Sequence, residues 1–170
     1  MTDETIEPPL MNGAATEEGP SEAPAIRVLA QYVKDFSFEN PNAPGSLREG
    51  SQPKIDLQLD VNARAMDEAG VFEVDLKINA KSERDGQAQF VIELVYSGLF
   101  GFSNIPADAI EPLLLAECPR LLFPFARQLI ATNSQAGGYP PLMLDPMDFG
   151  ALYASQRAPL AESEAPPMVQ

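Results

Sequence analysis

Few side chains in this chain could do chemistry, and none of them forms a recognisable reactive set. The sequence has no histidine, which removes the Ser-His-Asp and Cys-His arrangements and the usual acid–base residue near neutral pH. The single cysteine, Cys118, stands between Glu117 and Pro119 with no histidine to activate it. It is interpreted as a small packed apolar residue. We therefore expect no enzymatic activity, no cofactor and no zinc or other metal site.

Two further patterns resemble reactive sites only superficially. Glu73 and Asp75 alternate with apolar residues, which places both carboxylates on one outward strand face. A solvated face explains them better than a catalytic pair. Residues 98–102 (GLFGF) are expected to form a glycine-rich apolar bend. They are not a phosphate-binding loop, because the required glycine spacing and the following lysine are missing.

The charge balance limits the partners. The formal net charge is −14, and phosphates would repel such a chain, so we expect no nucleic-acid binding and favour a basic protein partner. No apolar run is long enough to span a bilayer, and the first residues lack the features of a signal peptide. A lone cysteine agrees with a reducing compartment. We expect a cytoplasmic chain with no direct membrane insertion.

The ends differ in composition from the middle. Residues 1–24 contain six acidic residues, four prolines and neither lysine nor arginine. Such a segment buries too little apolar surface to offset the entropy lost on ordering. We therefore expect a disordered acidic N-terminal tail (1–24), one folded domain (25–157) and a disordered C-terminal tail (158–170). The tails could serve solubility alone.

Alternating apolar residues predict four strands, at about 26–38, 54–61, 72–79 and 87–97. Asp85-Gly86 predicts a hairpin between the last two. The connections between the last three strands are short, so an antiparallel meander with one covered face is expected. In the first strand, strict alternation puts Asp35 and Glu39 on one face. The other face then holds Ile26, Val28, Ala30, Tyr32, Lys34, Phe36 and Phe38.

Helical residues follow the strands. A long helix is expected from about 106 to 136, kinked or broken near Pro119 because an interior proline removes a hydrogen bond. Gly137-Gly138 should end it. Asp145-Pro146 signals a last helix at about 146–157. The predicted class is α+β: a four-stranded antiparallel sheet with a long kinked helix and a C-terminal helix packed on one face.

The apolar surfaces leave two interpretations open. The apolar face of the fourth strand could be buried internally by the helices, or it could mediate self-association. Aromatic residues and methionines gather near glycine- and proline-rich bends, where they could be ordinary core residues or an adaptable apolar groove. From the residue pattern alone, the chain is an α+β domain with an acidic face and a possible apolar groove.

Two stretches, residues 32–44 (YVKDFSFENPNAP) and 117–127 (ECPRLLFPFAR), resemble the signature of the SecB family of protein-export chaperones. The resemblance implies a cytosolic holdase that binds unfolded preproteins and passes them to the SecA motor of the general secretory pathway. It implies a homotetramer built as a dimer of dimers, with no nucleotide requirement. The alternatives are a SecB-like chaperone serving a toxin–antitoxin system or another client, and a small-ligand-binding domain on the same fold.

The resemblance also implies roles for individual residues. The expected contacts with a basic, zinc-bearing tail of SecA are Asp35, Glu39, Val91 and Glu93. The expected oligomer-interface residues are Ile92, Leu94, Tyr96 and Cys118. The expected client-groove residues are Phe36, Phe38, Phe102 and Tyr139.

Overall fold

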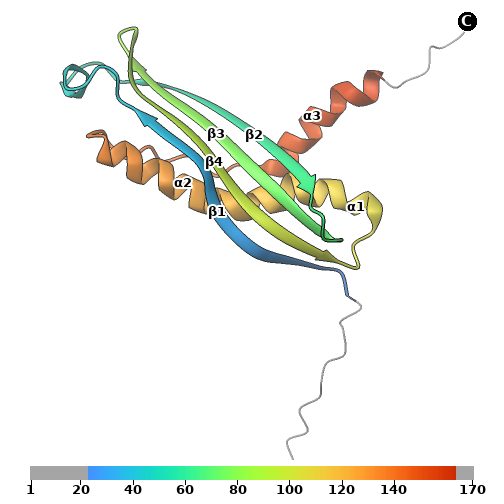
Figure 1. Ribbon diagram of the computed structural model, residues 1–170. Coiled ribbons are helices and arrows are strands. Elements are labelled where there is room, and N and C mark those ends of the chain that lie inside the picture. Colours follow the sequence, from blue (N-terminus) through green and yellow to red (C-terminus); the bar gives the residue numbers. More distant parts are fainter. Residues whose placement is uncertain (1–22, 164–170) are drawn as a thin grey trace, which may run out of the picture.

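The computed structural model describes residues 23–163, with side chains described to residue 157, so most of the expected tails lies outside the described residues. Four antiparallel strands form one sheet in the order β1-β4-β3-β2 (Figure 1). Their bounds are β1 (Ala25–Glu39), β2 (Lys54–Ala65), β3 (Val71–Arg84) and β4 (Gln87–Ser103). The predicted meander is confirmed for β2, β3 and β4. Strand β1 pairs with β4, which leaves β1 and β2 as the sheet edges.

The hairpin predicted at Asp85-Gly86 is present, with both residues at positive φ (53° and 76°) as a tight two-residue turn requires. Strand β4 is longer than predicted. Residues 98–102 form strand rather than a bend, because β1 and β3 pair with them on both sides. Gly98 is needed there, since a Cβ at this position would lie 2.8 Å from the Leu122 side chain.

The long helix follows in three pieces: α1 (Ala107–Pro112), the π-helical η2 (Leu113–Glu117) and α2 (Cys118–Ala136). A π segment carries one extra residue per turn and marks a local irregularity in a helix. It lies immediately before Pro119, where the sequence predicts a break. Helix α2 ends before Gly137, as expected, and a Cβ at Gly137 would collide with the Phe38 ring.

The last helix differs from the prediction. Helix α3 spans Phe149–Ser163, so it begins later than expected and continues past residue 157. Its first turn is capped by Asp148, whose Oδ1 accepts a hydrogen bond from the Ala151 amide (2.9 Å). The residue that caps the helix is therefore Asp148 and not Asp145, and the helix begins three residues later than predicted. The expected boundary at residue 158 falls within the helix.

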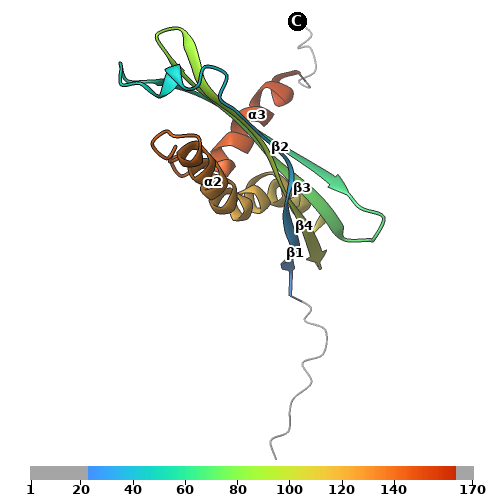
Figure 2. The ribbon, with the colours of Figure 1, turned by 60° about the vertical axis from the view of Figure 1, so that its left-hand side comes forward.

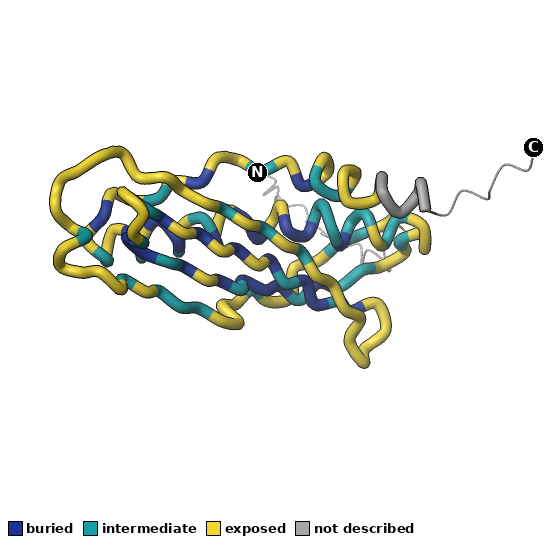
Figure 3. The backbone as a smooth tube through the Cα atoms, turned by 90° about the horizontal axis from the view of Figure 1, so that it is seen from above, coloured by how far each residue is buried: buried dark blue, intermediate teal, exposed yellow. Residues whose placement is uncertain are grey.

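Helix α2 lies along one face of the sheet (Figure 2), called the helix face below; the opposite face is the outer face. Burial is concentrated in β3, β4 and α2, whereas the edge strands are largely exposed (Figure 3). Each fully buried Leu, Ile or Phe stabilises the fold by about 1.5–3 kcal/mol. The largest fully buried side chains between sheet and helix are Leu76, Ile78, Ile92, Leu94, Phe100, Leu122 and Ile130.

Candidate functional site

Two irregularities in β1 decide which side chains face outward. The pairing with β4 shifts between Val28 and Ala30, and again between Val33 and Asp35. Each shift leaves one residue without a partner, and such a bulge moves the following residues to the other face of the sheet. Lys34 is the unpartnered residue of the second bulge. The expectation that Tyr32 shares a face with Phe36 was therefore wrong, because strict alternation assumes a regular strand.

The second bulge places two carboxylates of β1, Asp35 and Glu39, on the outer face. Asp35 pairs with Val95, and Glu39 pairs with Val91. Glu93 lies one pair away, opposite Ser37. The structure thus brings together on the outer face all four residues expected to contact SecA. The three carboxylates are exposed, and Val91 is half-buried.

A second group of charged residues lies on the outer face. The sequence predicts that its carboxylates are solvated, but in the structure Glu73 is buried. Glu73 is only 4% exposed. Its carboxylate accepts hydrogen bonds from the Tyr32 hydroxyl, from Lys34 Nζ (2.9 Å) and from Arg64 Nε (2.5 Å). These partners come from β1 and β2, so the carboxylate links three strands.

Asp75 extends this network to the fourth strand. Lys34 Nζ lies 2.8 Å from its Oδ2, and the Ser97 hydroxyl of β4 donates to its Oδ1 (2.6 Å). Burial alone would raise the pKa of Glu73, but the hydrogen bonds from Tyr32, Lys34 and Arg64 together lower that pKa to about 2. We call this group, Tyr32, Lys34, Arg64, Glu73, Asp75 and Ser97, the outer-face network.

The residues expected at the oligomer interface are core residues of the single chain. Ile92 and Cys118 are 0% exposed and Leu94 is 1% exposed, so their side chains already pack within the subunit. Tyr96 is 8% exposed and stacks on Phe125 of α2 (6.2 Å between ring centroids). Little of these four side chains is left uncovered in the single subunit, and their role in an oligomer interface stays a prediction. Burial, with a smaller contribution from Glu117, raises the pKa of Cys118 to about 12.

Exposed apolar residues lie instead at the margin between β1 and α2. Val33 pairs with Tyr96 and is 46% exposed, and Phe125 on the other side of Tyr96 is 51% exposed. Leu121 lies one helical turn before Phe125, and Val28 precedes Val33 along β1; both are exposed. We call Val28, Val33, Leu121 and Phe125 the apolar rim.

The four residues expected to line one client groove lie at different places on the helix face. Phe38 stacks on Phe90 (5.9 Å), and Phe90 in turn contacts Tyr139 (5.0 Å). Phe102 packs against Phe72 (5.1 Å), near the opposite ends of the strands. Phe36 is half-buried opposite Leu94. The structure therefore brings Phe38 and Tyr139 together but not Phe102.

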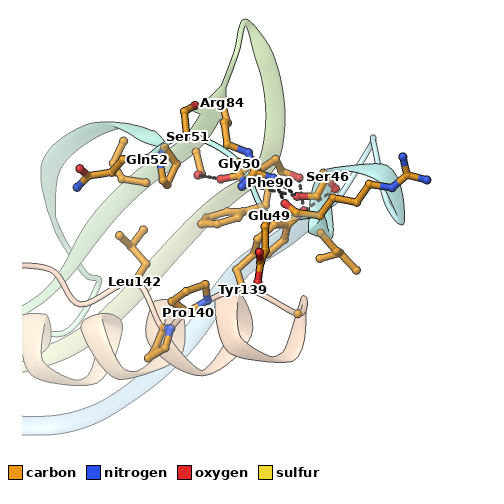
Figure 4. A pocket seen from close by; sticks show the side chains of 18 residues that line it. Ser46, Glu49, Gly50, Ser51, Gln52, Arg84, Phe90, Tyr139, Pro140 and Leu142 are labelled. Carbon is orange, nitrogen blue, oxygen red and sulfur yellow. Dashed lines mark hydrogen bonds between the residues drawn. The ribbon is translucent and has the colours of Figure 1, made fainter.

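A pocket of about 660 Å³ opens beside Tyr139 (Figure 4). Phe90, Tyr139 and Leu142 form one side of it, and the loop after β1 contributes residues 46–53. Ile55 and Leu47 add apolar side chains that are 39% and 45% exposed. The lining is predominantly apolar with polar groups from the loop, as in pockets that accept apolar segments.

Tyr139 holds that loop in place in addition to lining the pocket. Its hydroxyl lies 2.8 Å from Ser46 Oγ, 2.7 Å from Asn40 Oδ1 and 3.0 Å from the Gln89 carbonyl oxygen. Arg84 also donates to the Ser46 carbonyl oxygen (2.8 Å). The sequence reasoning missed the loop residues and Arg84. The prolines and glycines between residues 40 and 53 signal a loop, but they do not reveal where it folds back.

Among the described side chains, those of residues 23–157, no three or more His, Cys, Asp or Glu residues gather in a way that could hold a metal ion. Over the same range, no helix combines the length and apolar character needed to cross a bilayer.

Three comparisons with known proteins bear on this arrangement. The family model described as "Preprotein translocase subunit SecB" matches residues 19–159. A protein named "Protein-export protein SecB" from Caulobacter vibrioides is 52% identical over 160 residues, covering 93% of this chain and 94% of that protein. Proteins of the same name from Xanthobacter autotrophicus and Maricaulis maris are 53% and 55% identical, covering 84% and 81% of this chain and 89% and 80% of theirs.

Among solved structures, a SecB-like chaperone of Mycobacterium tuberculosis in complex with a peptide from an antitoxin aligns with a TM-score of 0.60. The alignment covers 72% of this chain and 90% of that one at 13% identity, so the likeness concerns the fold alone. The family match covers the whole sheet and the long helix, and the relatives sharing about half of the residues are named as export proteins. The chain belongs to the SecB family of protein-export chaperones.

Proposed function

We propose that this chain is a cytoplasmic holdase that binds unfolded preproteins, keeps them competent for translocation and delivers them to SecA. The observation that carries the proposal is that one sheet supports two different surfaces on opposite sides. An apolar pocket lies on the helix face, and three exposed carboxylates, Asp35, Glu39 and Glu93, lie with Val91 on the outer face. A client and a partner could therefore bind at the same time.

The helix-face pocket suits an unfolded segment. Its lining is predominantly apolar, and Met143, which is 58% exposed, follows the pocket residue Leu142 in the chain. A flexible thioether adapts to different apolar side chains. A protein that binds the unfolded chain and not the native one withdraws the client from folding by mass action, without ATP.

The outer face suits a basic partner. Asp35, Glu39 and Glu93 are exposed on adjacent strands, and Val91 provides an apolar contact among them. Exposed carboxylates of this kind chiefly accelerate association and make it sensitive to salt. We propose that the basic tail of SecA docks here.

The test of this docking site neutralises two of its carboxylates without changing their shape. The double variant Asp35→Asn/Glu93→Gln should bind SecA about tenfold more weakly at low salt, since complementary charges at an interface are lost. Isothermal titration measures the affinity, and suppression of preprotein aggregation without ATP measures client holding. Client holding should not change.

A matched control removes two exposed carboxylates elsewhere. Asp67 and Glu68 lie in the turn before β3, and Asp67→Asn/Glu68→Gln should leave SecA binding nearly unchanged. Equal loss of affinity in both double variants would show that only net charge matters. Loss of client holding in the first variant would show that the two surfaces are not separate.

We further propose that the chain assembles into a homotetramer and that the apolar rim mediates part of this contact. Large exposed apolar surfaces commonly mark sites of protein association, and the rim offers exposed apolar side chains where Ile92, Leu94 and Cys118 do not. Phe125→Asp should lower the assembly mass measured by multi-angle light scattering. Met66→Asp, at an exposed turn residue (39%), should not. An unchanged mass in Phe125→Asp would exclude this rim residue from the interface.

A further inference from the structure

We infer that Lys34, held by Glu73 and Asp75 across β4, is a positioning residue that turns Asp35 and Glu39 toward the outer face. The inference rests on the SecA-docking role proposed for that face. It assigns a function to the outer-face network, which neither the client pocket nor the docking contact uses directly.

The direction of Asp35 depends on the second bulge. With Lys34 unpartnered, Asp35 pairs with Val95 and points outward. If the strand were regular after Val33, Lys34 would take the place opposite Val95, and Asp35 would stand opposite Leu94 on the helix face. Leu94 is 1% exposed, and a carboxylate buried there without a partner would be strongly unfavourable. The β1 carboxylates of the outer face, Asp35 and Glu39, therefore point outward only while the bulge persists, whereas Glu93 of β4 does not depend on it.

The contacts of Lys34 explain how the bulge is held. Lys34 Nζ lies 2.9 Å from Glu73 Oε2 and 2.8 Å from Asp75 Oδ2, so one ammonium bridges two carboxylates of β3. To reach them from β1 it must extend across β4, where the small Ser97 lies between Tyr32 and Asp75 in the pairing.

The network also holds the residues next to Lys34. Tyr32, two residues before Lys34, donates to the same Glu73 carboxylate, and Arg64 donates to it from β2. Ser97 fixes Asp75 from β4. Because Glu73 is 4% exposed, losing one donor would leave a buried carboxylate partly unsatisfied. A regular strand would also turn Lys34 outward, but opposite Val95 and Lys77, one step farther from the level of Ser97 and Asp75. The carboxylates thus favour the position of Lys34 between these two levels, which is the bulged one.

When the charge of Lys34 is removed, its electrostatic effect and its positioning role predict opposite changes in the affinity for SecA. Lys34 carries a positive charge beside Asp35. Removing it makes the outer face more negative, so charge alone predicts tighter binding of a basic partner. Loss of the bulge predicts weaker binding. Lys77 provides a control, because it is exposed on the same face and pairs with Val95 from the β3 side.

The first experiment compares SecA affinity for three variants. We expect Lys34→Met to bind at least about fivefold more weakly, in the range of ordinary coupling between sites. Lys77→Met should bind as tightly as the unmodified chain or more tightly, and Lys34→Arg should retain binding because it keeps a cation that can bridge both carboxylates. The inference is overturned if Lys34→Met binds as tightly as Lys77→Met.

The second experiment is independent of SecA. A thiol introduced by Asp35→Cys should react rapidly with a labelling reagent, while the buried Cys118 remains slow. Adding Lys34→Met should slow labelling at position 35 by about tenfold if the side chain turns inward. Glu73→Gln should slow it in the same direction, which covers the case in which Lys34→Met fails to fold. Unchanged labelling in Glu73→Gln would overturn the inference.

The two experiments separate the inference from the function on which it rests. If Asp35→Asn/Glu93→Gln leaves SecA binding intact, the docking proposal fails, yet labelling at position 35 still shows whether Lys34 orients the strand. If that double variant weakens binding while Lys34→Met neither weakens binding nor slows labelling, the docking proposal stands and the positioning role of Lys34 is wrong.

Discussion

The two faces of the sheet are stabilised in different ways. On the helix face, strands β3 and β4 pack against α2 through apolar side chains such as Ile78, Leu94 and Leu122, all nearly or completely buried. On the outer face, the strands are connected through Glu73 and Asp75, whose partners come from the other three strands. One face is held by non-directional packing and the other by directional hydrogen bonds.

This difference matters for the function proposed above, in which a client and SecA bind to opposite faces of the sheet. Apolar packing tolerates variation in the side chains that meet it, which suits capture of many unfolded sequences. A hydrogen-bonded network fixes backbone geometry closely, which suits the display of a few carboxylates to one partner. The following predictions test this contrast, beginning with the largest expected effect.

Substitutions at two neighbouring residues of β4 should give the largest difference in stability between the two faces. Leu94 points to the helix face and Glu93 to the outer face. Leu94→Ala should lower the free energy of unfolding by about 2–5 kcal/mol because it creates a cavity in the core. Glu93→Ala should change it by less than about 0.5 kcal/mol, as is usual for an exposed residue. Urea denaturation measures both, and similar costs would contradict the proposed contrast.

Removing the charge of Glu73 should have an intermediate effect. Glu73→Gln keeps the size of the side chain but weakens hydrogen bonds from Tyr32, Lys34 and Arg64. A cost of about 1–3 kcal/mol is expected for disturbing a buried charge-assisted group. Glu83→Gln is the control, since Glu83 pairs with Lys81 at a more exposed site. Equal costs at both positions would show that the network adds no special stability.

Acid should selectively remove the contribution that Glu73 of the outer-face network makes to the free energy of unfolding. The pKa of Glu73 falls from an ordinary value of 4.5 to about 2 in the folded chain. Its contribution to stability is therefore fully present above pH 4.5 and is lost as the pH falls toward 2, at up to about 1 kcal/mol per pH unit. The difference in unfolding free energy between the unmodified chain and Glu73→Gln should shrink over this window. A constant difference would exclude the carboxylate as its source.

The smallest effect concerns the pocket side. Tyr139→Phe removes a hydroxyl that contacts Ser46, Asn40 and the Gln89 carbonyl oxygen. The free energy of unfolding should fall by about 1 kcal/mol, the typical net contribution of a hydrogen bond. Amide hydrogen exchange in residues 46–50 should rise, because the loop is released from the pocket wall. Unchanged exchange would show that other contacts, such as those of Arg84 and Gln89 with the Ser46 carbonyl oxygen, hold the loop without the Tyr139 hydroxyl.

The sequence predicts most of the architecture because local patterns determine it. The regular alternation after Lys54 identifies β2, and Asp85-Gly86 identifies the hairpin. The bulges of β1 could not be predicted, since they are defined by register against β4, about 60 residues away. The burial of Glu73 was missed for the same reason: its partners Tyr32 and Lys34 are about 40 residues distant in the chain. Side-chain alternation says which residues share a face only while the strand stays regular.

The bulges of β1 have one more consequence, for aggregation. This strand is 15 residues long and forms a sheet edge with exposed Val28, Leu29 and Val33. A straight, apolar edge of that length is a template for open-ended addition of strands from other chains. Two interruptions within it twist the edge and break the continuous run of free amide and carbonyl groups. The two bulges thereby protect a chaperone that binds unfolded chains from polymerising with them.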